Sequence, residues 1–506
     1  MDYIGTKQPP VNFKSYEWLG KETRAYYDMN PYPYWAFASW RTGNNGPLPK
    51  CLPIVRNIVD KSARWLFGKD IDIVCDNDTI KTAIDDVLDK NKIHSRLVNL
   101  AKLGGIEGGV ALKYNVVNNE VRIQTLSPVN EVKFYVNPHD KYEVLMVRIE
   151  YPFFDGENWY FYREEWTKDL YVVYKPLKAQ MLSARKENPY YYTQTPYSDT
   201  FSDKWEVKSS ETNKFGVIPV VLLKNMEDDS EYGKGDLFYL TRTVDRINLV
   251  YHLMDRSNQL DSDPVKVFID ADIDQDEMPH GTDAGDILSL KSDESENGEI
   301  KKADVKLLET KGLLRGPMEM YAKDMKNLLY EATGSVFSRP EDITNKGNLT
   351  QSVLVQLYAP MIEVVSEKRK TYGQEGIVRF LYVMCEGLKK AGVGDFKAFP
   401  DKCKIDIKWP DFFRLSSDEK FSEFDRLSRE VESGLITRKA AIEKIAELEN
   451  IENVKELVSE LEDWEPMEMQ LAKINSTTSQ GDYENGNEKG NSSRQQKRGK
   501  RVKDLQ

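Results

Sequence analysis

Residues 236–263 read DLFYLTRTVDRINLVYHLMDRSNQLDSD and have the apolar spacing of one long amphipathic helix. Asp236 is expected to cap its first turn, because a short polar side chain can accept hydrogen bonds from the unpaired backbone N–H groups there. Asp263-Pro264 is expected to end it, since the residue before a proline disfavours the helical conformation. Apolar residues recur three or four apart and predict one packing seam: Leu237, Leu240, Val244, Ile247, Tyr251 and Met254.

Residues 317–334, PMEMYAKDMKNLLYEATG, predict a second helix of similar character. Pro317 suits the first turn, where its missing N–H has no partner to lose, and Gly334 suits the C-terminal stop. The other faces of both helices are rich in charged and amide side chains, so two ordinary amphipathic helices of a globular core are an equally good interpretation of the pattern alone. The predicted seam of the second helix consists of Met318, Tyr321, Met325, Leu328 and Ala332.

The segment between the two helices is strand-forming at first and then strongly acidic. Residues 265–269, VKVFI, predict a strand. The alternating carboxylates after it resemble a calcium-binding loop, but the glycine at position six and the glutamate at position twelve are missing. We therefore interpret the segment as a solvated acidic hairpin, whose first carboxylates are Asp270, Asp272, Asp274, Asp276 and Glu277.

A polar loop and a third long helix follow the second helix. Residues 338–349 contain proline, glycine, asparagine and aspartate, which are typical of loops. Thr350 can cap a new helix, and Pro360 is expected to kink that helix because it removes a backbone hydrogen bond. The apolar stripe of this helix is Val353, Leu354, Leu357, Tyr358, Met361, Val364 and Val365.

The chain before residue 236 predicts a mixed α/β region with an antiparallel meander. Alternating apolar and polar residues predict strands at 121–125, 131–136, 143–149, 159–166 and 170–174. The aromatic residues of these strands are typical of a core or a subunit contact, and stacking on nucleic-acid bases is the less favoured alternative. They are Tyr151, Phe153, Phe154, Trp159, Tyr160, Phe161, Tyr162 and Trp166.

The C-terminal part of the chain predicts three helices and a polar tail. The helices are indicated by apolar spacing at 421–431, 441–448 and 454–461. Six of the ten residues at 494–503 are basic. We favour a solvated end for this tail over a segment that binds DNA or a scaffold.

Length and composition indicate a chain of two to four domains. The chain has 506 residues, of which 40% are hydrophobic, and a formal net charge of −12. No apolar run approaches the roughly 18 residues that a membrane helix needs, and the first residues lack the apolar core of a signal peptide. Cys51, Cys75, Cys385 and Cys403 lie far apart without a C-x-x-C pair, so we expect reduced thiols.

A search for catalytic motifs finds none, so we predict no enzyme, no cofactor and no metal site. The phosphate-binding pattern G-x-x-x-x-G-K-S/T is absent from the sequence. The glycines at 104, 105, 108 and 109 miss the spacing of a dinucleotide-binding loop and are better explained by a tight turn from a helix into a strand. The four histidines lack the spacing of zinc ligands, and no G-x-S-x-G elbow occurs.

The order of five motifs resembles the portal proteins of tailed bacteriophages, in their siphovirus-like branch. Each motif is weak alone, but their order and spacing are specific, and they extend over residues 52–464. The segments before and after that range match no motif of the family. The motifs are PIVRNIVDKSARWLFG (53–68), LGGIEGGVALKY (103–114), FGVIPVVLLKN (215–225), VDRIN (244–248) with Ser257-Asn258, and GLIT (434–437).

The resemblance implies an α+β portal fold divided into named parts. These are an N-terminal arm (1–50), a mixed α/β wing (51–235), a first stem helix (236–263), a β-rich clip (264–310), a second stem helix (311–337), a tunnel loop (338–349), a long kinked tunnel-to-wing helix that completes the wing (350–415), a helical crown (416–465) and a disordered basic C-terminal tail (466–506).

The resemblance also implies a function in the virion. A dodecameric ring of this chain at one capsid vertex would pass double-stranded DNA during packaging and ejection. It would dock the large terminase subunit, then head-completion or adaptor proteins, and contact major capsid and scaffold proteins; it would assemble in the host cytoplasm, without a membrane. The channel residues would be Arg339, Glu341, Asp342, Thr344, Asn345, Lys346 and Asn348 of the tunnel loop, and the docking residues the five clip carboxylates named above.

The net negative charge fits a conduit, because a wall that attracted phosphates strongly would hinder a moving DNA. Two other interpretations stay open: another head-completion or minor capsid protein, or an unrecognised nucleic-acid enzyme. The first alternative predicts a monomer or a small ring without a tunnel, and the second predicts metal-dependent turnover of DNA.

Overall fold

The computed structural model describes residues 16–30, 51–178, 205–228, 232–262, 315–336, 351–400, 402–413 and 417–449. It also describes short strands at 180–181, 196–197, 265–269, 271–272, 291–292 and 304–308. The chain forms two compact units, residues 1–413 and 414–506. Several predictions on the sequence lie outside the described residues: the tunnel loop, the clip carboxylates other than Asp272, the helix at 454–461 and the tail.

A three-stranded sheet lies at the centre of the first unit. Its strand order is β12 (Val220–Lys224), β2 (Gly109–Val117) and β3 (Glu120–Leu126), all antiparallel. Asn118 and Asn119 both have positive φ, as the tight turn of a two-residue hairpin requires. Helices α2 (Ile54–Phe67), α3 (Asp78–Lys90) and α4 (Ile93–Glu107) belong to the same unit and contribute to the buried cores.

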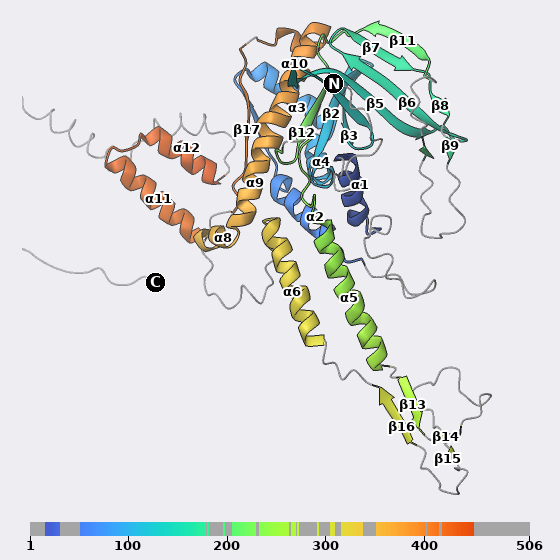
Figure 1. The fold of residues 1–506 in the computed structure, drawn as a ribbon. Helices are drawn as coiled ribbons and strands as arrows, with labels where there is room; N and C mark the ends of the chain where they lie inside the picture. Colours follow the sequence, from blue (N-terminus) through green and yellow to red (C-terminus); the bar gives the residue numbers. More distant parts are fainter. Residues whose placement is uncertain are drawn as a thin grey trace, which may run out of the picture. The chain divides into compact units, whose positions relative to one another are not determined.

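Four of the five predicted meander strands lie in a larger antiparallel sheet (Figure 1). Its order is β11 (Val207–Thr212), β7 (Leu170–Tyr174), β6 (Trp159–Thr167), β5 (Asp140–Phe154) and β4 (Val132–Asn137), with β8 (Leu177–Lys178) paired to β6. The first predicted strand, 121–125, is instead part of β3 in the three-stranded sheet, because it pairs with β2 and not with β4. Aromatic residues face each other across β5 and β6, as in the pairs Tyr151–Tyr162 and Phe153–Tyr160. Trp166 is buried and stacks on Tyr171, which supports the interpretation of the aromatic cluster as packing.

The long helix after residue 350 is divided into pieces. α8 (Gln351–Leu357) ends before Tyr358, and α9 (Ala359–Tyr372) begins with Pro360 in its first turn. The predicted kink is therefore a break between two helices, because proline is tolerated where an N–H has no intrahelical partner. A π-helical turn (Gly373–Val378) joins α9 to α10 (Arg379–Ala391), which is buried along one face.

Two glycines in α4 are needed for close packing. Gly104 and Gly105 lie inside the helix and not in the turn that we predicted, while Gly108, with φ of +89°, makes the turn into β2. A Cβ on Gly104 would lie 1.9 Å from the Tyr372 hydroxyl oxygen, so only glycine lets α4 and α9 approach this closely. Strands β1 (Asp72–Cys75) and β17 (Ile405–Lys408) pair antiparallel in the same unit.

The two helices predicted at the start are present as α5 (Thr241–Ser262) and α6 (Arg315–Ala332), which lie side by side (Figure 1). α5 begins at Thr241, so the prediction that Asp236 caps it is wrong; residues 236–240 form an irregular turn with Tyr239 at positive φ. Gly334 follows α6 with positive φ, as expected of a helix stop. Beyond α5, β13 (Val265–Ile269) pairs with β16 (Asp304–Leu308), and β14 (Ala271–Asp272) pairs with β15 (Lys291–Ser292).

The second unit contains two described helices, α11 (Ser417–Glu432) and α12 (Arg438–Glu449). Gly434 has positive φ after α11, and the Thr437 hydroxyl accepts a hydrogen bond from the Ala440 N–H at 3.3 Å, which caps α12. Leu427 and Ala446 are fully buried between these helices, whereas Phe421 and Leu435 are exposed.

Candidate functional site

The junction where α5 and α6 meet the rest of the first unit contains a network of buried polar groups. Val244 and Ile247 of α5 and Leu329 of α6 are buried in one apolar cluster. The Lys326 ammonium of α6 donates a hydrogen bond to the Tyr251 hydroxyl at 2.7 Å and lies 4.3 Å from the centre of its ring. The apolar seam, this hydrogen bond and the cation–π contact therefore hold the two helices together.

A buried ion pair links this junction to α9. The Lys368 ammonium lies 2.5 Å from Oδ1 of Asp236, and their side chains are 3% and 6% exposed. Lys368 also donates to the Ser62 hydroxyl at 2.7 Å, and the Asn225 amide donates to Asp236 Oδ1 at 2.7 Å. A buried charge pair is tolerated only when hydrogen bonds compensate for its lost hydration, so this network fixes the turn before α5 against α2 and α9.

Helix α1 (Tyr16–Tyr27) makes a second polar contact at the junction. The buried Tyr26 hydroxyl donates to Oδ1 of Asp245 on α5, and burial followed by this hydrogen bond raises the pKa of Tyr26 far above its ordinary range. Arg24 donates to the buried Glu107 at 2.9 Å, and Glu107 also accepts from the Ser127 hydroxyl at 2.5 Å. Part of the N-terminal arm is thus a fixed component of the body.

Lys61 of α2 contacts both flanks of the predicted tunnel loop. Its ammonium donates to the Val336 carbonyl, which follows α6, and lies 5.9 Å from the ring centre of Tyr358, which precedes α9. Trp65, one turn further along α2, stacks on the same tyrosine at 5.1 Å between ring centres. Burial lowers the pKa of Lys61. The loop itself lies outside the described residues, but both chain segments that enter it are held by α2.

The predicted seam of α5 is largely correct, whereas that of α6 is displaced by about one residue. Leu237, Val244 and Ile247 are fully buried, and Leu240 and Tyr251 pack against them. On α6 the buried positions are Ala322 and Leu329, with Met325 beside them; Tyr321 is 43% and Leu328 is 53% exposed, Met318 is half-buried and Ala332 is exposed. The small Ala322 explains the shift, because an alanine at the contact lets two helices approach closely.

The buried position of Lys368 could have been predicted from the sequence, whereas the contact made by Tyr26 could not. Met361, Val365 and Tyr372 are the buried apolar residues of α9, and the buried Lys368 lies on the same face at helical spacing. A lysine within an apolar stripe indicates a buried charge with a partner. The partners of Tyr26 and Arg24 lie 219 and 83 residues away in the sequence, and no local sequence pattern predicts these contacts.

The described residues contain neither a metal centre nor a membrane-spanning helix. No cluster of three or more histidine, cysteine, aspartate or glutamate side chains in the described ranges is arranged to bind a metal ion. Among the helices that the structure describes, none combines the length and the apolar character that crossing a bilayer requires.

The described residues form an α+β fold that contains two antiparallel sheets and a pair of long helices, α5 and α6. The family model described as "Phage portal protein, SPP1 Gp6-like" matches residues 51–472, and the chain therefore belongs to this family of portal proteins. The recognition that the motifs suggested is confirmed, and so is the α+β fold class.

Comparison with solved structures finds distant similarity to chains of gene transfer agent particles. A chain of the native virion has 11% identity and a TM-score of 0.38, covering 87% of this chain and 96% of that one. A chain of the empty particle's neck, computed with C6 symmetry, has 12% identity and a TM-score of 0.39, covering 78% and 90%. A chain of the native neck, computed with C12 symmetry, has 11% identity and a TM-score of 0.36. No curated protein matches the chain.

Proposed function

We propose that copies of this chain form a closed ring, dodecameric in the virion, which replaces one capsid vertex and forms the channel for double-stranded DNA. The match to the portal family over most of the chain is the observation that carries this proposal. In this ring, α5 and α6 are the stem, the strands β13–β16 belong to the clip, and α11 and α12 belong to the crown.

The exposed flank of α6 supports a ring, because a single copy leaves apolar side chains in water there. Tyr321 and Leu328, two turns apart on one face of α6, are 43% and 53% exposed, and Met320 next to Tyr321 is 67% exposed. Contiguous exposed apolar groups typically mark a protein interface. A head-to-tail contact that closes on itself would cover the same flank in every subunit.

Electron microscopy and mass photometry of the full chain test this proposal. The wild type is expected to form rings with a central hole. The double variant Tyr321→Glu/Leu328→Glu is expected to stay monomeric with an unchanged melting temperature, because both side chains are exposed in the single chain. The control Lys323→Glu/Asn327→Glu adds glutamates to exposed polar positions of the same helix and is expected to keep its rings. A wild type that is monomeric throughout the micromolar range would contradict the proposal.

We further propose that residues 338–349 line the channel, with Arg339, Glu341, Asp342, Thr344, Asn345, Lys346 and Asn348 nearest the DNA. The described residues on either side of this segment support the proposal, because α2 contacts both Val336 before it and Tyr358 after it. Replacing residues 340–348 by a Gly/Ser linker of equal length is expected to preserve rings and to impair packaging or retention of DNA. A normal yield of packaged DNA from this variant would remove the loop from the mechanism.

The proposed partners and location follow from the vertex position. The clip would dock the large terminase subunit during packaging and head-completion or adaptor proteins afterwards, and the body would contact major capsid and scaffold proteins. The ring would assemble in the host cytoplasm and remain at the capsid vertex of the virion. Its part in these steps is structural and needs no catalytic group of its own.

A further inference from the structure

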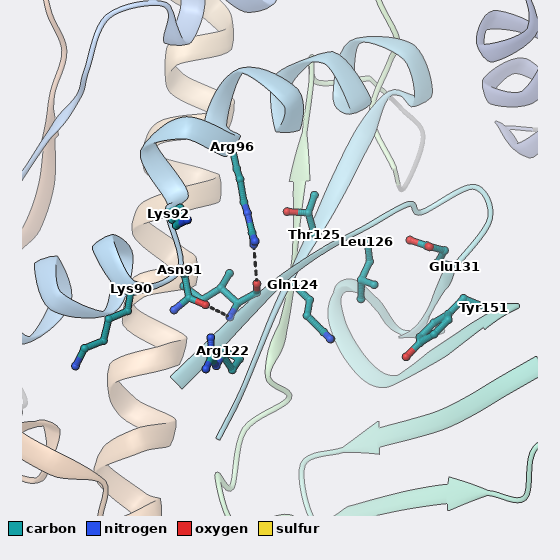
Figure 2. A pocket seen from close by; sticks show the side chains of 11 residues that line it. Lys90, Asn91, Lys92, Arg96, Arg122, Gln124, Thr125, Leu126, Glu131 and Tyr151 are labelled. Carbon is teal, nitrogen blue, oxygen red and sulfur yellow. Dashed lines mark hydrogen bonds between the residues drawn. The ribbon is translucent and has the colours of Figure 1, made fainter. Parts of the chain in front are cut away.

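A basic groove lies on the first unit. It is lined by residues within the range 90–151, and α5 and α6 contribute none of its lining residues. It has a volume of about 700 Å³ and is formed by the end of α3, the turn into α4, the first turn of α4 and the edge strand β3 (Figure 2). Four cationic side chains line it, Lys90, Lys92, Arg96 and Arg122, and all four are exposed. One carboxylate, Glu131, is also among the lining residues.

The charge of this groove is opposite to that of the chain, which carries a net −12. Lys90 pairs with Asp86 at 2.6 Å and Arg122 pairs with Glu120 at 2.5 Å. Exposed pairs of this kind contribute little and exchange readily for another anion. Within the described part of the chain, Lys92 and Arg96 form no salt bridge with a carboxylate, so two cations are available without breaking any pair.

Asn91 joins the elements that form the groove by hydrogen bonds. Its buried amide donates to the carbonyls of Val87 and Val121, both at 2.8 Å, and its Oδ1 accepts from the Ile123 N–H at 2.8 Å. The Arg96 guanidinium donates to the Ile123 carbonyl at 3.5 Å (Figure 2). The end of α3, the start of α4 and β3 are therefore held together, and the cations that these elements present line the same groove.

The same contacts argue against a peptide as the ligand of this groove. A peptide that extended the sheet would need the outward-facing N–H and C=O groups of β3. Asn91 already bonds those of Val121 and Ile123, so this part of the edge is closed to another strand. A ligand recognised by charge, without sheet bonds, fits the groove better.

We propose that this groove binds the phosphodiester backbone of double-stranded DNA, independently of base sequence. Lysine and arginine from several elements that face one open groove are the usual means of neutralising successive phosphates. Binding of a polyanion follows from the groove alone, while the choice of DNA rests on the proposed function. The site lies outside the predicted channel loop and gives the body a contact with DNA of its own.

Fluorescence anisotropy of a short labelled duplex with the full-length protein at low salt tests the proposal. The variant Lys92→Glu/Arg96→Glu is expected to weaken binding about tenfold or more, and its slope of log K against log salt should fall by about 2, because each lost phosphate contact contributes about 0.9. The control Lys208→Glu/Lys214→Glu makes the same charge change at exposed positions on and beside β11 and should weaken binding less than about twofold, because only the general charge effect remains.

Four further measurements separate the alternatives. Melting temperatures of both variants show whether they are folded, and Lys92→Gln/Arg96→Gln repeats the test without adding negative charge. Millimolar inorganic phosphate and polyaspartate are added as competitors; a groove that binds polyaspartate and not the duplex would overturn the proposal in favour of an acidic protein segment. Equal affinity of groove and control variants would also overturn it. Ring formation is recorded separately by microscopy, so failure of the ring proposal is distinguishable from failure of this one.

Discussion

Lys368 and Asp236 show how one residue pair can fix the position of a whole element. The two charges are almost completely buried and share hydrogen bonds with Ser62 and Asn225. Such a pair contributes little net stability when intact, because dehydration of the ions offsets their attraction. Removal of one partner is costly, however, since the remaining charge stays buried without compensation. The pair therefore specifies where the turn before α5 lies against α9.

We predict that Lys368→Met lowers the free energy of unfolding by about 3–5 kcal/mol, because Asp236 would remain buried without its counter-charge. The matched control is Lys370→Met, two residues along the same helix at an exposed position, with an expected effect within about 0.5 kcal/mol. Urea denaturation followed by tryptophan fluorescence measures both. Equal effects of the two substitutions would show that the pair has no specifying role.

Glu131 leads to a prediction about pH. Burial, followed by a smaller contribution from Glu107, raises the pKa of Glu131 above its usual value, although the hydrogen bond from the Ser127 N–H at 2.7 Å opposes this shift. The Glu131 carboxyl therefore stays protonated to a higher pH in the folded protein than in the unfolded chain. The free energy of unfolding falls as pH rises from the unfolded-state pKa of Glu131 to its higher folded-state pKa.

Glu131→Gln imitates the protonated form and should escape this loss. We expect the variant to melt at a higher temperature than the wild type at neutral pH. The difference should shrink as pH falls towards about 4.3, the ordinary pKa of glutamate, because the wild type is then protonated as well. Thermal melts of both proteins over this pH range provide the measurement, and a difference that is constant with pH would contradict the assignment.

At the scale of elements, the sequence predicted regular structure well and tertiary contacts less well. Apolar spacing located α5, α6 and the meander because periodicity reflects which side of an element is buried. It misplaced the seam of α6, since Tyr321 and Ala322 are adjacent and only the fit against α5 decides between them. The basic groove was not predicted, because its cations come from separate segments that tertiary contacts, including those of Asn91, bring to one groove.

Helix α1 contacts the body through residues that are far from it in the sequence. We predict that Tyr26→Phe lowers stability by about 1–3 kcal/mol, because the buried Asp245 loses the hydroxyl that donates to it. Tyr27→Phe is the control: its hydroxyl bonds Asp60 at 2.8 Å, but Asp60 is only half-buried and also pairs with Lys102 at 3.1 Å, so a smaller cost is expected. Chemical denaturation of the two variants measures both costs, and equal costs would contradict the greater role that we assign to the bond between Tyr26 and Asp245.

At the scale of the whole molecule, charge is distributed unevenly along the chain. This distribution agrees with the proposed roles of the clip, which would dock proteins, and of the basic groove, which would bind DNA. The chain is acidic overall, and the segment at 270–299 concentrates carboxylates between the two stem helices. The basic groove, lined by Lys90, Lys92, Arg96 and Arg122, has the opposite charge. A negatively charged surface repels the DNA backbone and attracts basic surfaces of other proteins, which suits an element that docks partners and not DNA.

We predict that the triple substitution of Asp272, Asp274 and Asp276 by lysine leaves rings intact but weakens binding of the large terminase subunit and increases non-specific retention of DNA. Exposed charges are screened over about 8–10 Å at physiological ionic strength. Wild-type binding should therefore weaken as salt is raised, whereas the residual binding of the variant should depend less on salt. Pull-down with wild-type and variant rings at two salt concentrations measures this. The control reverses Glu157, Glu206 and Glu211, three exposed carboxylates of the body, and should bind like the wild type. Equal binding under all conditions would place the docking surface elsewhere.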